Sequence, residues 1–339
     1  MKFKKLLVGM FSLALPGLTI LALETPARAA GLIFSEAFGG AGTDSGEFTI
    51  PVGIAVDDGG NVYVADRNNH RIQKFDRSGK FIGRFGSPGN ENGQLRYPTG
   101  VAVDGAGNIY VADSGNDRVQ KFNRQGVFVA QLGSTGRGNG QFNIPTGIAV
   151  DAEANIYVVD RGNDRVQKFN RQGVFLSKFG STGKGNGQFN SPYGIALDSQ
   201  GSLYVTDIGN NRIEKFNSKG VFVSKLGRIG SGNGEFYNPF GIAVDGGGSI
   251  YVTDIGNNRV KQFDGSGSFV ASFENPNRNK NKEQTFFPFG VAADKFGNVY
   301  VTDVGNNQVA KFNISSGVAS TSSSTGNGYE QYTAFEELP

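Results

Sequence analysis

Six short segments of this chain carry residue types that could bind a cation. One of them reads Asp113-Ser114-Gly115-Asn116-Asp117-Arg118. The others are Asp66–Arg71, Asp160–Arg165, Asp207–Arg212, Asp254–Arg259 and Asp303–Gln308. Oxygen-rich loops of this kind suit hard cations such as calcium. The alternative is a turn in which Asp accepts backbone N–H groups and Arg pairs with a carboxylate. Because the segment recurs so regularly, we favour the turn and predict no metal site, with calcium as the alternative.

Other catalytic chemistry has little material to work with. The chain has no cysteine and one histidine, His70, so it has neither a thiol nucleophile nor a histidine cluster. His70 takes a turn position that Asp or Asn occupies in the other copies, and we predict no catalytic role for it. A further set of aspartates ends the first strand of each copy: Asp57, Asp104, Asp151, Asp198, Asp245 and Asp294. We expect these to be structural too, and we name no catalytic residue.

The elements that position these groups repeat along the chain. Each copy opens with a proline, and the spacing between successive prolines is 47 four times and then 49. The prolines are Pro51, Pro98, Pro145, Pro192, Pro239 and Pro288. Each copy contains four short β-rich runs separated by turns rich in Gly, Asn and Asp, and this period is typical of a propeller blade. The sequence therefore predicts an all-β, six-bladed β-propeller of four-stranded blades.

The repeat boundaries give a domain plan. We place the repeats near 48–86, 95–133, 142–180, 189–227, 236–273 and 286–313, within a propeller domain that spans 30–317. The last copy lacks a good fourth strand, whereas residues 32–38 match one. We therefore expect 32–38 to complete blade six, because an open blade would expose unpaired strand edges. Residues 318–339 are predicted to form a flexible polar tail.

Residues 1–29 have the features of a signal peptide. Three lysines precede an apolar run from Leu6 to Leu23, and Ala27-Arg28-Ala29 matches the pattern before a cleavage site. An uncleaved membrane anchor is the alternative. Cleavage predicts a periplasmic or extracellular protein without a stable membrane span. It also removes four basic residues and one acidic residue from a chain of net charge +3, which leaves the mature protein near neutral. We therefore expect no nucleic-acid partner.

The repeated motif resembles a known family. The string Pro-x-Gly-Ile-Ala-Val-Asp, Asn-Ile-Tyr-Val-x-Asp, x-x-Asn-x-Arg-Val-Gln-Lys-Phe is similar to the NHL repeat, from about Phe34 to Asn313. The resemblance implies a six-bladed propeller. It also implies that relatives bind proteins or single-stranded RNA on one face, and that some propellers of similar build are metal-dependent lyases or lactonases. No such activity transfers without its residues.

Two positions differ between the copies and indicate a binding surface. They are the residue after each opening proline and the residue after each turn aspartate, which should share one face of the propeller. Blades one to three have mostly Thr, Ser and Arg at these positions, whereas blades four to six have aromatic and branched apolar residues. We predict ligand binding by Arg67, Arg161, Thr99, Thr146, Tyr193, Phe240, Phe289, Ile208 and Ile255. Apolar groups gathered at a channel opening often mark a binding site. The alternative is that the aromatic residues pack into the channel as core.

These observations predict an exported, non-enzymatic scaffold that binds a protein, peptide or cell-envelope ligand at the mouth of the channel. A calcium-dependent lyase or lactonase is the alternative, and RNA binding is a weaker one. The loop Glu274–Glu283 is longer than its counterparts and carries three cations. It is either a solvated polar loop or an anion contact above the apolar half of the mouth.

Overall fold

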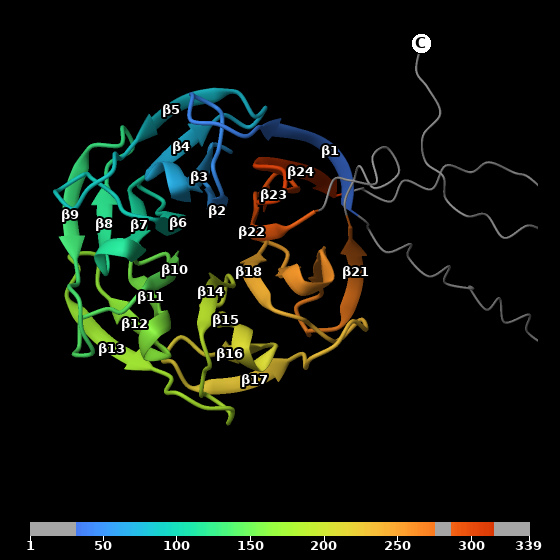
Figure 1. Ribbon diagram of the computed structural model, residues 1–339. Coiled ribbons are helices and arrows are strands. Elements are labelled where there is room, and N and C mark those ends of the chain that lie inside the picture. Colours follow the sequence, from blue (N-terminus) through green and yellow to red (C-terminus); the bar gives the residue numbers. More distant parts are fainter. Residues whose placement is uncertain (1–31, 275–285, 315–339) are drawn as a thin grey trace, which may run out of the picture. The chain divides into compact units, whose positions relative to one another are not determined.

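The computed structural model describes residues 32–274 and 286–314. These residues form six antiparallel sheets of four strands each, arranged around a central axis (Figure 1). The predicted fold class is therefore confirmed. The predicted signal peptide (1–29), the flexible tail (318–339) and nearly all of the loop after Glu274 lie outside the described residues. Within the described ranges, no helix is both long and apolar enough to cross a membrane.

The first three blades have the same strand lengths and the same order from the axis outward. Blade one contains β2 (Pro51–Val56), β3 (Val62–Asp66), β4 (Arg71–Phe75) and β5 (Phe81–Phe85). Blade two contains β6 (Pro98–Val103), β7 (Ile109–Asp113), β8 (Arg118–Phe122) and β9 (Phe128–Leu132). Blade three contains β10 (Pro145–Val150), β11 (Ile156–Asp160), β12 (Arg165–Phe169) and β13 (Phe175–Phe179).

Blades four and five follow the same plan, and blade six begins in the same way. Blade four contains β14 (Pro192–Leu197), β15 (Leu203–Asp207), β16 (Arg212–Phe216) and β17 (Phe222–Leu226). Blade five contains β18 (Pro239–Val244), β19 (Ile250–Asp254), β20 (Arg259–Phe263) and β21 (Phe269–Phe273). The last three strands are β22 (Pro288–Ala293), β23 (Asn298–Asp303) and β24 (Gln308–Ile314).

The outer strand of blade six comes from the start of the described chain. Strand β1 (Leu32–Gly39) pairs antiparallel with β24, from Leu32 opposite Ile314 to Gly39 opposite Gln308. In Figure 1 the blue strand β1 accordingly lies beside the red strand β24. The sequence analysis assigned residues 32–38 to this position. The blade thus combines both ends of the described chain, which leaves no missing outer strand.

Glycine is required on the innermost strands because neighbouring blades approach closely there. A Cβ atom on Gly100 would lie 2.0 Å from the carbonyl oxygen of Thr146, and one on Gly194 would lie 2.4 Å from that of Phe240. A Cβ atom on Gly290 would lie 2.2 Å from the carbonyl oxygen of Val52, so the same close approach joins blade six to blade one. Such distances exclude any side chain, so the repeated glycine of the motif is a packing requirement.

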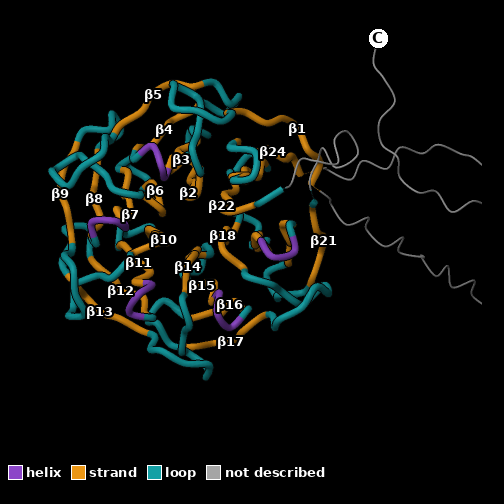
Figure 2. Tube along the Cα trace, viewed as in Figure 1, coloured by secondary structure: helices purple, strands orange, loops and turns teal. Residues whose placement is uncertain are grey.

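In blades one to five, the turn between the second and third strands is a six-residue segment that begins with Asp and ends with Arg, and these two residues form an ion pair. In blade six, Gln308 replaces the arginine and its Nε2 donates to Oδ2 of Asp303. A short 3₁₀ turn follows the strand: η1 (Arg67–Asn69), η2 (Ser114–Asn116), η3 (Arg161–Asn163), η4 (Ile208–Asn210) and η5 (Ile255–Asn257). In blade three, Asp160 is fully buried and its Oδ2 lies 2.7 Å from Nε of Arg165. Arg165 also donates to the carbonyl oxygens of the glycine-rich connector. These turns appear as purple segments on one face in Figure 2.

Candidate functional site

The axis of the propeller holds a narrow, mostly apolar well of about 70 Å³. Glycines of the innermost strands and a ring of buried aliphatic residues form much of its wall, together with Val52, Thr99, Thr146, Tyr193 and Phe289 at the position after the opening proline. That ring contains Ile54, Val101, Ile148, Ile195, Ile242 and Val291. A volume of this size accepts a few waters or one small side chain. We call the end of this well that carries the residue after each opening proline the mouth.

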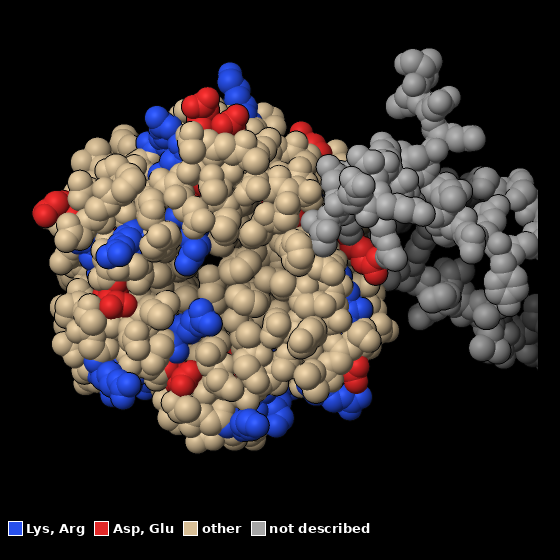
Figure 3. All heavy atoms as spheres, viewed as in Figure 1, with Lys and Arg blue, Asp and Glu red and all other residues tan. Residues whose placement is uncertain are grey.

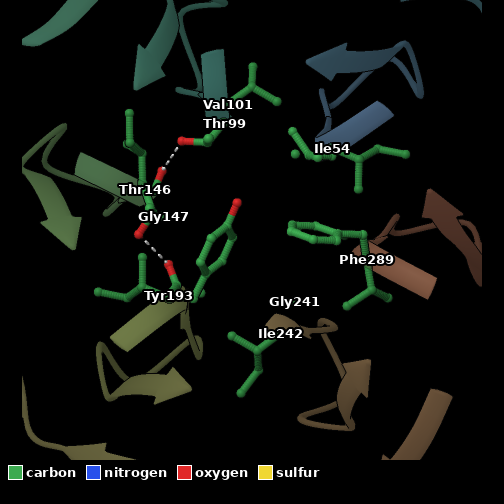
Figure 4. A pocket seen from close by; sticks show the side chains of 17 residues that line it. Ile54, Thr99, Val101, Thr146, Gly147, Tyr193, Gly241, Ile242 and Phe289 are labelled. Carbon is green, nitrogen blue, oxygen red and sulfur yellow. Dashed lines mark hydrogen bonds between the residues drawn. The ribbon is translucent and has the colours of Figure 1, made fainter. Parts of the chain in front are cut away.

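An aromatic cluster of Tyr193, Phe240 and Phe289 covers one side of the mouth. The ring centroids of Tyr193 and Phe240 are 4.9 Å apart, those of Phe240 and Phe289 are 4.6 Å apart, and those of Tyr193 and Phe289 are 5.3 Å apart. All three residues are half-buried. Figure 4 shows the Tyr193 ring extending toward the centre of the circle of innermost strands, with its hydroxyl directed to the opposite side and the Phe289 ring pointing toward it. The three predicted aromatics therefore share one partly accessible surface.

Arg67 and Arg161 supply positive charge near this cluster. The guanidinium of Arg161 lies 5.9 Å from the ring centroid of Tyr193, and that of Arg67 lies 5.0 Å from the ring centroid of Tyr97. Burial raises the pKa of the Tyr193 phenol, and the charges of Arg161 and Arg67 act in the opposite direction. Neither arginine forms an ion pair within the described residues, and the Tyr193 hydroxyl has no hydrogen-bond partner there. Three polar groups at the mouth thus have unused donors.

Thr99 and Thr146 are buried, in contrast to the expectation that they line an exposed polar half of the mouth. Their side chains are 6% and 1% exposed. Thr146 Oγ1 donates to the carbonyl oxygen of Tyr193 in the next blade at 2.9 Å (Figure 4). Thr99 Oγ1 lies 2.5 Å from Oγ of Ser114, which donates to the carbonyl oxygen of Pro145. These hydroxyls connect blades, so their part in ligand binding stays a prediction without support from exposure.

The apolar half of the mouth makes the same inter-blade contact from a different position. Thr206, Thr253 and Thr302 stand one residue before the turn aspartate, where blades one to three have Ala65, Ala112 and Val159. Thr206 Oγ1 accepts the backbone N–H of Gly194 at 2.7 Å and donates to the carbonyl oxygen of Phe240 at 2.7 Å. Thr253 and Thr302 repeat this arrangement. Part of the difference between the two halves of the mouth therefore reflects which strand supplies the inter-blade hydroxyl. The two positions compared in the sequence do not include the second-strand threonine.

Ile208 and Ile255, the remaining predicted residues, begin the turns of blades four and five. Ile208 is 9% exposed and Ile255 is half-buried. Both lie beside the mouth rather than in the well, since neither lines its wall. Tyr237 and Phe287 are 49% and 41% exposed and precede the opening prolines of blades five and six. The apolar half of the mouth thus continues outward onto the face.

His70 has a structural role at the junction of blades one and two. Its Nδ1 accepts the backbone N–H of Tyr97 at 3.0 Å, and its ring lies 4.6 Å from the Tyr97 ring. Asp117 and Asp164 accept the equivalent N–H groups in the following blades, and Asn307 accepts that of Ile50, which joins blade six to blade one. Burial is the main cause that lowers the pKa of His70, with a further contribution from Arg67. The neutral imidazole is therefore the form compatible with this contact, because its Nδ1 can accept a hydrogen bond.

The turn aspartates that could have bound calcium already have protein partners. Asp66 illustrates this, since Oδ1 accepts the backbone N–H of Thr49 at 2.8 Å and Oδ2 lies 2.7 Å from Nε of Arg71. Its side chain is fully buried. Within the described ranges no group of three or more His, Asp or Glu residues is arranged to hold a metal. The contacts support the turn interpretation, and calcium binding stays a prediction for metal analysis.

The geometry of the mouth suits recognition of a ligand that has both an apolar and an anionic part. The aromatic cluster offers apolar area, and the arginines offer guanidinium donors that match carboxylates. Scaffold and mouth together define the class of this molecule: it is a six-bladed β-propeller with a narrow axial opening. The NHL repeat model matches residues 48–75, 95–122 and 142–169, and a 6-bladed beta-propeller model matches 198–281. The chain therefore contains NHL repeats.

Known proteins share this repeat or this fold over different spans. A B-box type zinc finger protein, ncl-1 of Caenorhabditis elegans, is 50% identical over 50 residues, which cover 15% of this chain and 6% of that protein. A streptogramin B lyase has a TM-score of 0.59 and 19% identity, covering 85% of this chain and 99% of its own. A gluconolactonase of Xanthomonas campestris has a TM-score of 0.61 and 14% identity, with the same coverage. At these identities the two structures show a shared fold.

Proposed function

We propose that this propeller is a non-enzymatic binding module whose mouth recognises an acidic peptide segment. In this proposal an apolar side chain of the ligand packs on the aromatic cluster, and a neighbouring carboxylate bonds to Arg67 and Arg161. The observation that carries the proposal is the pairing of an accessible three-ring cluster with two half-buried arginines that lack a carboxylate partner in the described structure. Half-buried cations next to apolar surface bind carboxylates more strongly than fully solvated ones.

The test is selection from a displayed peptide library, followed by binding measurements on a labelled peptide from the selected set. We expect enrichment of sequences with Asp or Glu next to an aliphatic or aromatic residue. The double variant Arg67→Gln/Arg161→Gln should then weaken binding by about tenfold or more, since charged hydrogen bonds of this kind contribute about 2 kcal/mol or more. The matched control is Lys80→Gln/Arg84→Gln, which removes the same charge from exposed positions at the outer edge of blade one.

A second pair of variants separates the apolar contact from the charge. Phe240→Ala should weaken peptide binding while leaving both arginines in place, because aromatic anchors dominate such sites. Circular dichroism would establish that each variant remains folded. Selected peptides whose affinity is unchanged by Phe240→Ala and by Arg67→Gln/Arg161→Gln would overturn the proposal.

The enzyme alternative has weaker support. The lyase and the lactonase above share this fold at low identity, and His70 already accepts a backbone N–H group. Metal analysis of the purified protein distinguishes the two functions, because a stoichiometric bound cation would favour the calcium-dependent enzyme. We also propose that the protein acts in the periplasm or outside the cell, on the basis of residues 1–29. N-terminal sequencing of the protein from its host would test cleavage after Ala29.

A further inference from the structure

A second surface, away from the axial well, is formed by the outer strands of blades two, three and four, the turns that precede these strands and the connectors that follow them. We call it the basic rim. It carries exposed cations in every one of these blades: Arg124, Arg137, Arg171, Lys178, Lys184, Lys219, Lys225 and Arg228. Figure 3 shows basic side chains along the rim over β13 and β17. Among the described residues, the only ion pair that involves these eight cations is that of Arg228 with Glu235.

Acidic residues are rare in the same segments. Residues 123–141 and 170–188 contain no Asp or Glu, and the equivalent residues 217–235 contain only Glu235, the partner of Arg228. The outer segments of blades one and five differ, since residues 76–94 contain three basic and two acidic residues and residues 264–283 contain three of each. The near-neutral total charge therefore conceals an uneven distribution around the circumference. The net charge of the whole chain does not reveal this distribution, which appears only when charges are counted blade by blade.

Protection of free strand edges does not account for this pattern. Lysine on an edge strand discourages pairing with other chains, and Lys178 and Lys225 are placed for that role. Six of the eight cations, however, lie in turns or connectors outside the outer strands, for example Arg124, Arg137 and Arg171. The outer strand of blade five, β21, contains no lysine or arginine and has an equally free edge. The cations thus follow the surface of three blades rather than the edges alone.

Exposed aliphatic side chains lie among these cations. Each of the three blades presents a valine just before its outer strand and a Val or Leu within it. These residues are Val127, Val129, Val174, Leu176, Val221 and Val223, all between 49% and 59% exposed. Exposed apolar groups gathered in this way favour an interaction surface over simple solvation. The partner should therefore offer both negative charge and apolar faces.

The shape and composition of the basic rim narrow the kind of partner. Three successive blades of a six-bladed ring turn through about half a circle, so a flat bilayer would meet only one blade edge at a time. A flexible linear chain can follow the whole arc. Single-stranded nucleic acids are usually held by aromatic side chains on which bases stack. The exposed large apolar residues of these outer strands are aliphatic only, so they offer no platform for base stacking. Aliphatic side chains can still make van der Waals contact with the C–H faces of sugar rings.

We propose that the basic rim of blades two to four binds a linear acidic polysaccharide, with carboxylates on the cations and sugar faces on the aliphatic residues. This site is distinct from the mouth and does not depend on the function proposed for the mouth. Each blade supplies a similar set of groups, so a longer chain gains contacts as it reaches the next blade. Affinity should rise with chain length and fall steeply with salt.

The experiment uses the full propeller and polyuronate oligomers of increasing length, with calorimetric titration at low and moderate salt. Lys178→Glu/Lys225→Glu changes the charge of two adjacent blades at equivalent strand positions. We expect it to weaken binding of the longest oligomer by about tenfold or more. The control Lys80→Glu/Arg84→Glu makes the same charge change on blade one, outside the basic rim, and should weaken binding less than about twofold. Melting curves of both variants would establish that the ring is intact.

Each result supports or overturns the proposal. Binding that strengthens with length and is lost only in the rim variant supports it. Equal losses in the two variants would show that net charge alone matters, and absence of binding at low salt would remove the site. Tighter binding of single-stranded RNA or of anionic vesicles than of the longest polyuronate would overturn the assignment of the partner.

Discussion

Blades three and four each donate a threonine hydrogen bond to a carbonyl oxygen of the next blade, but from different strands. In blade three, Thr146 bonds the carbonyl oxygen of the next blade from the position after the opening proline. In blade four, Thr206 makes this bond from the second strand, and the position after the proline is Tyr193. When the second strand supplies the hydroxyl, the mouth position is free to carry an aromatic ring. A residue at the mouth can therefore vary when the second strand of the same blade, here through Thr206, supplies the hydroxyl instead.

The largest effect is expected when the buried hydroxyl of Thr206 in blade four is removed. Thr206→Val keeps the shape of a fully buried side chain but leaves the N–H of Gly194 and the carbonyl of Phe240 without a partner. We expect a loss of about 2 kcal/mol in the free energy of unfolding, measured by denaturant titration. Adding Tyr193→Thr recreates the blade-three pair of Thr146 and Val159 and should restore about 1 kcal/mol. A double variant no more stable than Thr206→Val would refute the interchange.

A second difference between these blades concerns the third strand. Blades one to three have Gln73, Gln120 and Gln167 at a fully buried position where blade four has Glu214. Burial raises the pKa of Glu214 to about 7. The carboxylate therefore costs stability in the folded state: stability is highest below about pH 4.5, falls as the pH rises toward 7, and is level above it.

Glu214→Gln should remove this pH dependence, because the amide stays neutral. At pH 8 we expect the variant to be about 1 kcal/mol more stable than the wild type, and near pH 4 the two should converge. Thermal melting at a series of pH values measures the difference. A variant less stable than the wild type at pH 8 would show that the pairing of Glu214 with Arg212, 3.0 Å apart, outweighs the burial.

The smallest expected effect concerns the junction of blades one and two. His70 has a lowered pKa, so its bond from Tyr97 N–H contributes fully above the ordinary histidine pKa of about 6.5 and is lost as the pH falls through the folded-state value. His70→Asn substitutes the side chain that Asn307 uses at the equivalent junction. Its stability should not change between pH 7 and pH 5, whereas the wild type should lose about 0.5 kcal/mol. Identical pH profiles would contradict this role.

The fold was predictable because the physical requirements of a blade recur in every copy. The period of the prolines, the glycine of the innermost strand and the aspartate of the turn each correspond to a contact that the structure shows. The mouth was harder to predict, because residues near in space come from different strands and different blades. Thr99 and Tyr193 align in the repeat, yet Thr99 is a buried residue that hydrogen-bonds toward the next blade, whereas Tyr193 belongs to the half-buried aromatic cluster. A comparison of Ala65, Ala112 and Val159 with Thr206 would have revealed the exchange from the sequence.

The placement of β1 in the last blade has a consequence for how the molecule comes into being. Strand β1 is synthesised before every other described strand, and it has to wait for β24, which is synthesised after all of them. Until then, blade six lacks its outer strand and the ring is not closed. Pairing between such distant segments slows folding, since a long loop must close first. Early blades can form as they are synthesised, but the circle becomes a single cooperative unit only when its two ends meet.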